Sequence, residues 1–354
     1  MRRTGRRVLV AATVVVVVVS VLPAGRARVK AAFVLAEALG VDVPRPLAPE
    51  VSRRRAEIGG TSGDLYLPGK PAPPIVLVPG AAPKGPDDER VVRLAFSLAR
   101  AGRAVFVPEL ALARREFVTS DIDGLVTATR ALDDDPRTAG PPVLLGFSYG
   151  GSFALVAAAD PRLDGRLELV ATFGAYFDLV GVAQAVTTGT SLVAGRELEW
   201  DAHPDATKVF REVIVGLAPS EVRRALRRAL DGDVAEVDLP PEARSIYEFA
   251  TNSDPARTFE LASLLPDAMR TRLEEFSPSS VAGGVGAPVV ALHSTDDPVV
   301  PYGEGVRLAE GIDGARLVTV SLFRHVDPDG GRLGAIPDFI RSWRFTSWII
   351  AAQE

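Results

Sequence analysis

The chain has 354 residues, and 47% of them are hydrophobic, which is sufficient for one large globular core. Its formal net charge of -5 argues against nucleic acid as a partner, since no basic stripe would neutralise phosphates. The absence of cysteine excludes disulfides, thiolate metal ligands and a thiol nucleophile.

An arginine-rich start and an apolar run from Val8 to Leu22 are typical of an export signal or a membrane anchor. The run is shorter than the roughly 20 residues of a spanning helix, but no good cleavage site follows it. We therefore expect an uncleaved anchor, with the rest of the chain outside the cytoplasm because more arginines precede the run than follow it. A secreted, cleaved form and a buried first element of the domain are the alternatives. Residues 1–50 are assigned to this segment, a short helix over 31–40 and a linker.

From residue 51 onward, apolar strands alternate with amphipathic helices. The predicted strands lie at residues 64–67, 75–78, 104–107, 143–145, 167–173, 288–293 and 315–320, and the first helices at 88–101 and 120–132. This alternation predicts an α/β fold with a mainly parallel sheet and helices on both faces. Catalytic loops should then gather at the carboxyl ends of the strands.

The alternation stops between residues 179 and 286, where the chain is predicted to form successive helices. Asp178 is expected to cap or turn the chain at the start of this segment, and Ser220 to cap a helix within it. An insertion at this point would lie over the catalytic edge of the sheet as a lid. Residues 51–354 are thus predicted to form one domain with a helical lid at about 179–286.

A serine stands between two glycines where a predicted strand changes directly into a predicted helix. The strand is 143–145, the helix is 152–159, and the serine is Ser148. A turn this tight requires residues without bulk two positions before and after the serine, and these are Gly146 and Gly150. The pattern predicts a nucleophile elbow.

Such an elbow requires a carboxylate and then a histidine later in the chain, each just after a strand. The strand at 288–293 is followed by Asp296 and Asp297, and the strand at 315–320 by His325. The chain contains only three histidines, so few assignments are possible.

The other candidate residues have simpler interpretations. His293 ends a strand and is read as structural, and His203 as a solvated loop residue, although catalysis by either is an alternative. Asp327 and Asp329 lie beside His325 but lack the spacing of a zinc site, so no metal and no cofactor are predicted.

Three motifs make the chain resemble the α/β-hydrolase superfamily, in particular its dienelactone-hydrolase-like and prolyl-oligopeptidase-like serine esterases. They are GFSYGG at the elbow, HSTDDPVVP after the penultimate strand and HVDP near the end, and the resemblance covers about residues 60–350 apart from the insertion. In that branch the acid lies in a G-x-x-D-x-x-V-P pattern, which implies Asp297 and makes Asp296 the alternative. Ser294 occupies the glycine position of this pattern.

The resemblance implies an α/β-hydrolase fold and a triad of Ser148, His325 and Asp297. The oxyanion hole would use the backbone N–H groups of Tyr149 and, in the loop after the strand at 75–78, of Ala81. Related enzymes usually carry His-Gly in that loop, where this chain has proline and glycine.

The implied function is hydrolysis of a small-molecule carboxylic ester through an acyl-enzyme, on short to medium acyl chains. Acyl transfer and amide or peptide hydrolysis use the same triad and stay open. A catalytically silent binding protein is a further alternative, because a fold does not guarantee activity. The sequence contains no signal for an oligomeric state.

Overall fold

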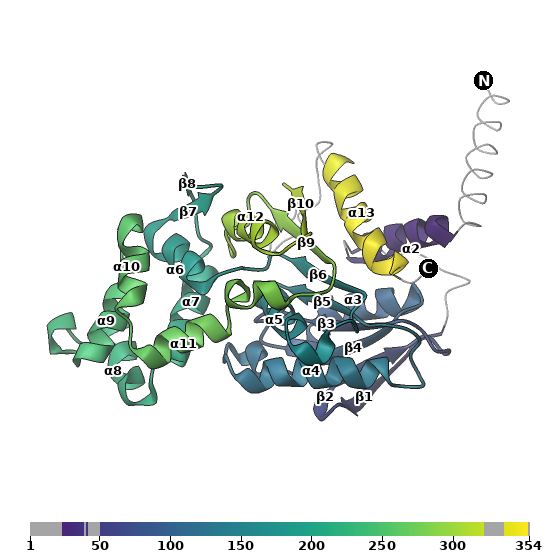
Figure 1. Ribbon diagram of the computed structural model, residues 1–354, viewed down its shortest axis with the longest axis horizontal. Coiled ribbons are helices and arrows are strands. Elements are labelled where there is room, and N and C mark those ends of the chain that lie inside the picture. Colours follow the sequence, from purple (N-terminus) through teal and green to yellow (C-terminus); the bar gives the residue numbers. More distant parts are fainter. Residues whose placement is uncertain (1–22, 39, 42–49, 322–335, 353–354) are drawn as a thin grey trace, which may run out of the picture.

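The computed structural model describes residues 23–38, 40–41, 50–321 and 336–352, and its centre is an eight-stranded sheet (Figure 1). From one edge to the other, the strands are β1 (Ser52–Ile58), β2 (Thr61–Leu67), β4 (Ala104–Pro108), β3 (Pro74–Val78), β5 (Val143–Phe147), β6 (Leu169–Phe173), β9 (Val289–Ser294) and β10 (Arg316–Val320). The six neighbouring strands β4, β3, β5, β6, β9 and β10 run parallel, and β1 and β2 form an antiparallel hairpin at one edge. The predicted mainly parallel sheet is confirmed.

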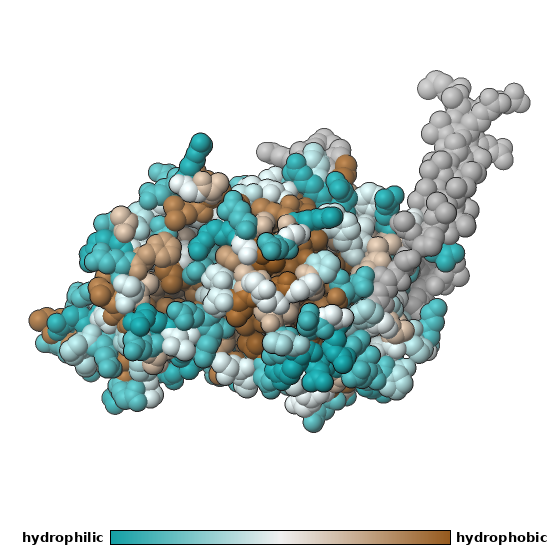
Figure 2. Space-filling model, in the orientation of Figure 1, coloured by the Kyte–Doolittle hydropathy of each residue, from teal (hydrophilic) through white to brown (hydrophobic). Residues whose placement is uncertain are grey.

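The central strands are buried because helices cover both faces of the sheet. Every residue of β3 and β4 is buried, as the continuous apolar runs in their sequences predict. Strand β1, with the sequence SRRRAEI, was not predicted because it lacks apolar alternation. It is an exposed edge strand, and Figure 2 shows mostly hydrophilic side chains over the β1–β2 end of the sheet.

The two faces of the sheet carry separate hydrophobic cores. Helices α4 (Thr119–Asp133), α5 (Tyr149–Ala158) and α12 (Tyr302–Gly311) cover one face. Helices α2 (Pro23–Ala38), α3 (Glu89–Arg100) and α13 (Ile336–Ala351) cover the other, which we call the α2 face. Side chains alternate between the cores, so that Leu144 belongs to the first and its neighbour Leu145 to the second.

Helix α2 is packed into the domain, although it precedes the predicted boundary at residue 51. Ala27, Ala31 and Val34 are buried in the core of the α2 face together with α13. The Trp343 indole donates a hydrogen bond of 2.7 Å to the Arg28 carbonyl. Within the described residues no helix is both long and apolar enough to cross a membrane, and the run from Val8 to Leu22 lies outside them.

The insertion lies at one end of the molecule, beside the sheet (Figure 1). Its elements are α6 (Leu179–Thr188), β7 (Thr190–Val193), β8 (Arg196–Glu199), α7 (Pro204–Leu217), α8 (Ser220–Leu230), α9 (Pro241–Ala250), α10 (Thr258–Ser263) and α11 (Asp267–Glu275). It is largely helical, as predicted, except for the β7–β8 hairpin. The predicted cap at Ser220 is wrong, because the residue before α8 is Pro219 and no side chain caps that helix.

Candidate active site

Ser148 occupies a strained turn between β5 and α5. Its φ of 51° and ψ of -132° lie outside the regions that residues with a side chain usually adopt. Its backbone N–H donates a hydrogen bond of 2.8 Å to the Phe173 carbonyl at the end of β6, which holds the turn at the carboxyl edge of the sheet. The turn has the geometry predicted for a nucleophile elbow.

The two glycines of the motif are required by close backbone contacts. A Cβ atom on Gly146 would lie 2.4 Å from the Gly151 Cα, and one on Gly150 would lie 2.3 Å from the Pro79 carbonyl oxygen. No side chain fits at these distances without movement of the backbone. The glycines therefore bring strand β5, helix α5 and the loop after β3 together at the serine.

The predicted oxyanion donors flank this serine. Tyr149 is the first residue of α5, so its N–H is one of those that helix geometry leaves without an intrahelical acceptor. The loop after β3 passes close by, because a Cβ atom on Gly80 would lie 2.9 Å from the Ser148 Cβ. Ala81 follows Gly80 in this loop and lines the same cavity as Ser148.

The Tyr149 side chain is held in the core of the face that carries α5. Its ring packs edge-on against Phe117 and Tyr176, with centroids 5.6 and 5.1 Å apart. Burial raises the pKa of the Tyr149 hydroxyl, and the charge of Arg115 opposes this shift. The phenol therefore stays neutral.

Asp297 is buried in the loop after β9, whereas Asp296 is exposed. The Oδ1 atom of Asp297 accepts hydrogen bonds from the backbone N–H groups of Val299, at 2.9 Å, and Val300, at 3.1 Å. These bonds fix the orientation of the carboxylate. Burial and fixed orientation are the properties required of the acid in a triad, so they favour Asp297 over Asp296.

His293 supports the same loop. It is buried, and its Nε2–H donates to the Val300 carbonyl at 3.0 Å, while Nε2 lies 3.7 Å from the Asp297 Oδ2 atom. Gly305 of α12 packs against the imidazole, since a Cβ atom there would lie 2.5 Å from Nδ1. These contacts agree with the structural role predicted for His293.

The insertion is attached to the Asp297 loop by two residues. The Trp200 indole donates to the Asp297 carbonyl at 2.7 Å, a contact that no sequence signal indicated. The His203 backbone N–H donates to the Pro298 carbonyl at 2.7 Å, and its Nδ1 accepts from the Asp205 N–H at the start of α7. His203 thus caps a helix, where the sequence predicted a solvated loop residue.

The predicted base, His325, lies outside the described residues, as do Asp327 and Asp329. The described chain before it ends at Ser321, directly after β10. The Thr295 N–H donates to the Val320 carbonyl at 2.8 Å, so the segment that leads to His325 starts beside the loop that carries Asp297. Across the described ranges, no group of three or more histidine, aspartate or glutamate residues could hold a metal ion.

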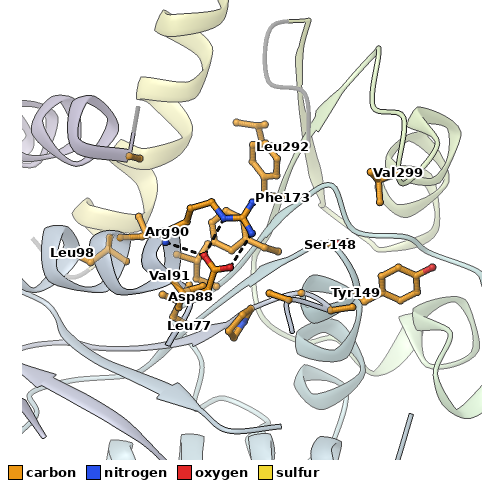
Figure 3. Close-up of a pocket in the computed structure, with 18 of the residues that line it drawn as sticks. Leu77, Asp88, Arg90, Val91, Leu98, Ser148, Tyr149, Phe173, Leu292 and Val299 are labelled. Atoms are coloured by element: carbon orange, nitrogen blue, oxygen red, sulfur yellow. Dashed lines mark hydrogen bonds and ion pairs between the residues drawn. The ribbon is translucent and has the colours of Figure 1, made fainter. Parts of the chain in front are cut away.

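A cavity of about 470 Å³ adjoins Ser148 (Figure 3). Its lining includes the loop after β3, Val299 and Val209 of α7. Asp88 and Arg90, at the start of α3, form an ion pair in its wall, with Arg90 Nη2 2.9 Å from Asp88 Oδ2. The Arg90 guanidinium, which hydrogen-bonds the carboxylate, holds the pKa of Asp88 below its usual range, so the pair stays ionised.

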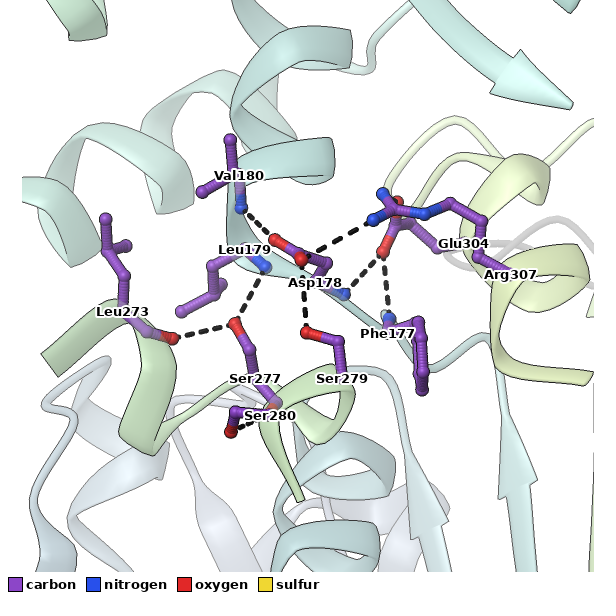
Figure 4. Close-up of polar contacts among 10 residues, drawn as sticks. All are labelled: Phe177, Asp178, Leu179, Val180, Leu273, Ser277, Ser279, Ser280, Glu304 and Arg307. Atoms are coloured by element: carbon purple, nitrogen blue, oxygen red, sulfur yellow. Dashed lines mark hydrogen bonds and ion pairs between the residues drawn. The ribbon is translucent and has the colours of Figure 1, made fainter. Parts of the chain in front are cut away.

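A buried polar network lies at the junction of β6 and the insertion (Figure 4). Glu304 of α12 accepts from the N–H groups of Phe177 and Asp178, at 2.9 and 2.7 Å, and pairs with Arg307. Asp178 accepts from the Val180 N–H at 2.7 Å, so its predicted role as the cap of α6 is confirmed. The network joins α12 to the first turn of the insertion.

No protein-family model matches the chain, and no curated protein matches its sequence. Among solved structures, it is similar to the α/β hydrolase GrgF from Penicillium sp. sh18, with a TM-score of 0.50 and 16% identity over 84% of this chain and 98% of that one. It is also similar to a hormone-sensitive lipase from a metagenome library, with a TM-score of 0.49 and 15% identity over 93% and 92% of the two chains. A third similar structure is brefeldin A esterase, a bacterial homologue of human hormone-sensitive lipase, with a TM-score of 0.48 and 16% identity over 92% and 85%.

The sheet order, the strained serine turn and the likeness to the Penicillium hydrolase identify the fold. The chain has the α/β-hydrolase fold, as the sequence motifs predicted.

Proposed function

We propose that the protein is a serine hydrolase that cleaves carboxylic esters, with Ser148 as the nucleophile. The observation that carries this proposal is the strained backbone of Ser148, held at the start of α5 and beside an open cavity. Strain of this kind persists only where the surrounding structure enforces it, and it is concentrated at functional sites. The buried, oriented carboxylate of Asp297 supports the same reaction.

In the proposed mechanism, the Ser148 oxygen attacks the ester carbonyl carbon while His325 takes the hydroxyl proton. The N–H groups of Tyr149 and Ala81 stabilise the negative charge on the carbonyl oxygen. The ester C–O bond then breaks, and His325 returns the proton to the leaving alcohol. Water, deprotonated by His325, releases the acid from Ser148, and Asp297 stabilises the imidazolium in both halves of the reaction.

A fluorophosphonate probe, which reacts with an activated serine, tests this proposal. We expect labelling of the wild type and loss of labelling in Ser148→Ala, with ester hydrolysis reduced at least about a thousandfold. Ser97→Ala is the matched control, because Ser97 is also buried but lies in α3, outside the cavity lining. A folded wild type that neither reacts with the probe nor hydrolyses any ester would instead support a binding protein.

Acyl transfer and amide hydrolysis are the alternatives on the same residues. Product analysis in the presence of an added alcohol separates them: the free acid supports the esterase, and a new ester supports an acyltransferase. Hydrolysis of the matching anilide at a higher rate than the ester would support an amidase.

We also propose that residues 8–22 hold the enzyme at a membrane, with the catalytic domain outside the cytoplasm. The support is the apolar run and the arginines before it. Alkaline extraction of membranes should leave the full chain in the pellet and release a chain lacking residues 2–22. Expression of the full chain that yields a soluble protein shortened at its start would favour the secreted form.

A further inference from the structure

The cavity beside Ser148 continues from the elbow onto the α2 face of the sheet. Its floor is formed by Leu77, Leu145 and Leu292, and all three belong to the hydrophobic core of that face. The helices of the α2 face supply the walls; their lining residues are Val34, Leu35, Ala38, Val91, Leu94, Leu98, Ser342, Phe345, Thr346 and Ile349. We call this part of the cavity the inner channel.

The insertion takes little part in this lining. Among the described residues that line the cavity, only Asp205 and Val209 come from the insertion. The sequence predicted that this insertion would lie over the catalytic edge of the sheet as a lid. The described lining instead lies mainly on the opposite side of the serine, between the sheet and helices α2, α3 and α13.

The chemistry of the inner channel favours an aliphatic occupant. Its walls are almost entirely aliphatic and aromatic. The Thr346 hydroxyl already donates to the Ser342 carbonyl at 2.9 Å, whereas the Ser342 hydroxyl has no hydrogen-bond partner among the described residues. Asp88 and Arg90, which also line the cavity, form an ion pair with each other. Apart from this one hydroxyl, the lining of the inner channel offers a polar or charged substrate group little to replace its hydration, so the polar end of a ligand should lie at Ser148. The whole cavity, of which the inner channel is a part, has a volume of about 470 Å³, which falls within the range of small-molecule sites and far exceeds the needs of an acetyl group.

We propose that the inner channel binds the acyl chain of the substrate, which is an ester of a long-chain fatty acid. This inference rests on the proposed function and specifies its substrate class, in place of the short to medium chains predicted from the sequence. With the ester carbonyl at Ser148, the chain runs beneath α2 toward α13. Each methylene that moves from water into such a site raises affinity about fourfold, so chain length dominates selectivity.

Helix α2 gives this channel a connection to the chain's apolar start. The helix follows directly after the run from Val8 to Leu22, and its residues Val34, Leu35 and Ala38 form one wall of the inner channel. The predicted anchor and the channel wall are therefore consecutive segments of the chain. Ala38 is exposed as well as lining the cavity, so this end of the channel lies near the protein surface.

A series of nitrophenyl esters from acetyl to palmitoyl tests the proposal on the full chain. For the wild type, we expect kcat/KM to rise at least tenfold from acetyl to dodecanoyl. Thr346→Trp should fill the inner channel and lower dodecanoyl hydrolysis at least tenfold more than acetyl hydrolysis. Ser347→Trp is the matched control, because Ser347 is adjacent on α13 and does not line the cavity; it should keep the wild-type profile.

Val209→Trp tests the alternative that the acyl chain binds on the side of the cavity lined by the insertion. If it removes the preference for long chains while Thr346→Trp does not, the chain binds under the insertion and the inner-channel proposal is wrong. An equal rate for all chain lengths in the wild type would also overturn it while leaving the esterase intact.

Binding of a fluorescent fatty acid to Ser148→Ala separates the channel from catalysis. We expect saturable binding that Thr346→Trp weakens at least tenfold and Ser347→Trp leaves unchanged. Binding without hydrolysis by the wild type would support the channel and contradict the proposed function. Absence of binding by the folded Ser148→Ala protein would overturn the channel, whatever the activity.

Discussion

At the scale of single residues, the site is organised by backbone geometry. Ser148 adopts a positive φ, although a side chain makes this costly by about 1–3 kcal/mol. The strained conformation is maintained by the surrounding backbone, because Gly146 and Gly150 pack directly against backbone atoms of adjacent segments. The loop after β9 similarly orients Asp297 with two backbone N–H groups.

Asp297→Asn should therefore lower kcat roughly ten-thousand-fold, while the protein stays folded. The amide can still accept from Val299 and Val300 with its oxygen, but it then presents an NH₂ group where the histidine needs an acceptor. Steady-state kinetics with a nitrophenyl ester measure the effect.

The control for this substitution is Asp296→Asn, because Asp296 is adjacent but exposed. It should leave kcat within about threefold of the wild type, as surface changes usually do. The reverse pattern, with a large loss at Asp296 only, would transfer the acid role to that residue.

At the scale of elements, the insertion is connected to the domain by specific polar contacts rather than by chain continuity alone. Trp200 and His203 contact the Asp297 loop, and Glu304 of α12 holds the first residues before α6. Glu304 and Phe177 are buried, whereas Asp178 and Arg307, the other members of the network, are partly exposed (Figure 4). Removing one member of this network leaves the polar groups of the others without their hydrogen-bond or ion-pair partner.

Glu304→Ala should lower the free energy of unfolding by about 3 kcal/mol, because Arg307 and two backbone N–H groups lose their acceptor. Chemical denaturation measures this value. Glu310→Ala, at an exposed position on the same helix, should change it by less than about 0.5 kcal/mol. Equal effects of the two substitutions would show that the network contributes nothing specific.

The same glutamate should make stability depend on pH. Burial raises the pKa of Glu304 above its usual value of 4.5, and the charge of Arg307 opposes this shift. A raised pKa in the folded state adds stability below pH 4.5 that is lost as the pH rises through the folded value. The unfolding free energy of the wild type should therefore fall relative to Glu304→Gln as the pH increases, and an opposite trend would contradict the raised pKa.

At the scale of the whole molecule, the domain depends on a helix from its N-terminal region. Helix α2 covers the same face of the sheet as α3 and α13, and buries Ala27, Ala31 and Val34 against them. Although the sequence analysis placed the start of the domain at residue 51, a chain that started there would lack α2 and uncover this core.

A chain lacking residues 2–41 should unfold at a temperature more than about 10 °C below that of a chain lacking residues 2–22. Val34 and Leu35 each contribute about 1.5–3 kcal/mol through burial, Ala27 and Ala31 contribute less, and α13 loses its partner. Differential scanning calorimetry of the two truncated forms measures the difference. Equal unfolding temperatures would show that α2 does not stabilise the domain.

Features with a local cause could be predicted from the sequence. The central strands follow from continuous apolar runs, because strands buried on both faces exclude polar residues. The elbow follows from the two glycines around Ser148, since close backbone contact permits nothing larger. The cap at Asp178 was also predictable, because its side chain accepts from a backbone N–H only two residues further on. Ser220 is not a cap, because propensity alone does not set where a helix begins.

The remaining features depend on contacts between segments that are distant in the chain. Strand β1 is highly charged and forms because β2 supplies a partner, and the β7–β8 hairpin likewise has no apolar alternation. Contacts between distant segments also bury Asp297, place Trp200 against its loop and pack α2 into the domain. The sequence by itself determined the α/β fold and the serine turn, since both rest on neighbouring residues. Only the tertiary structure decided where the cavity runs, because its walls come from helices at opposite ends of the chain.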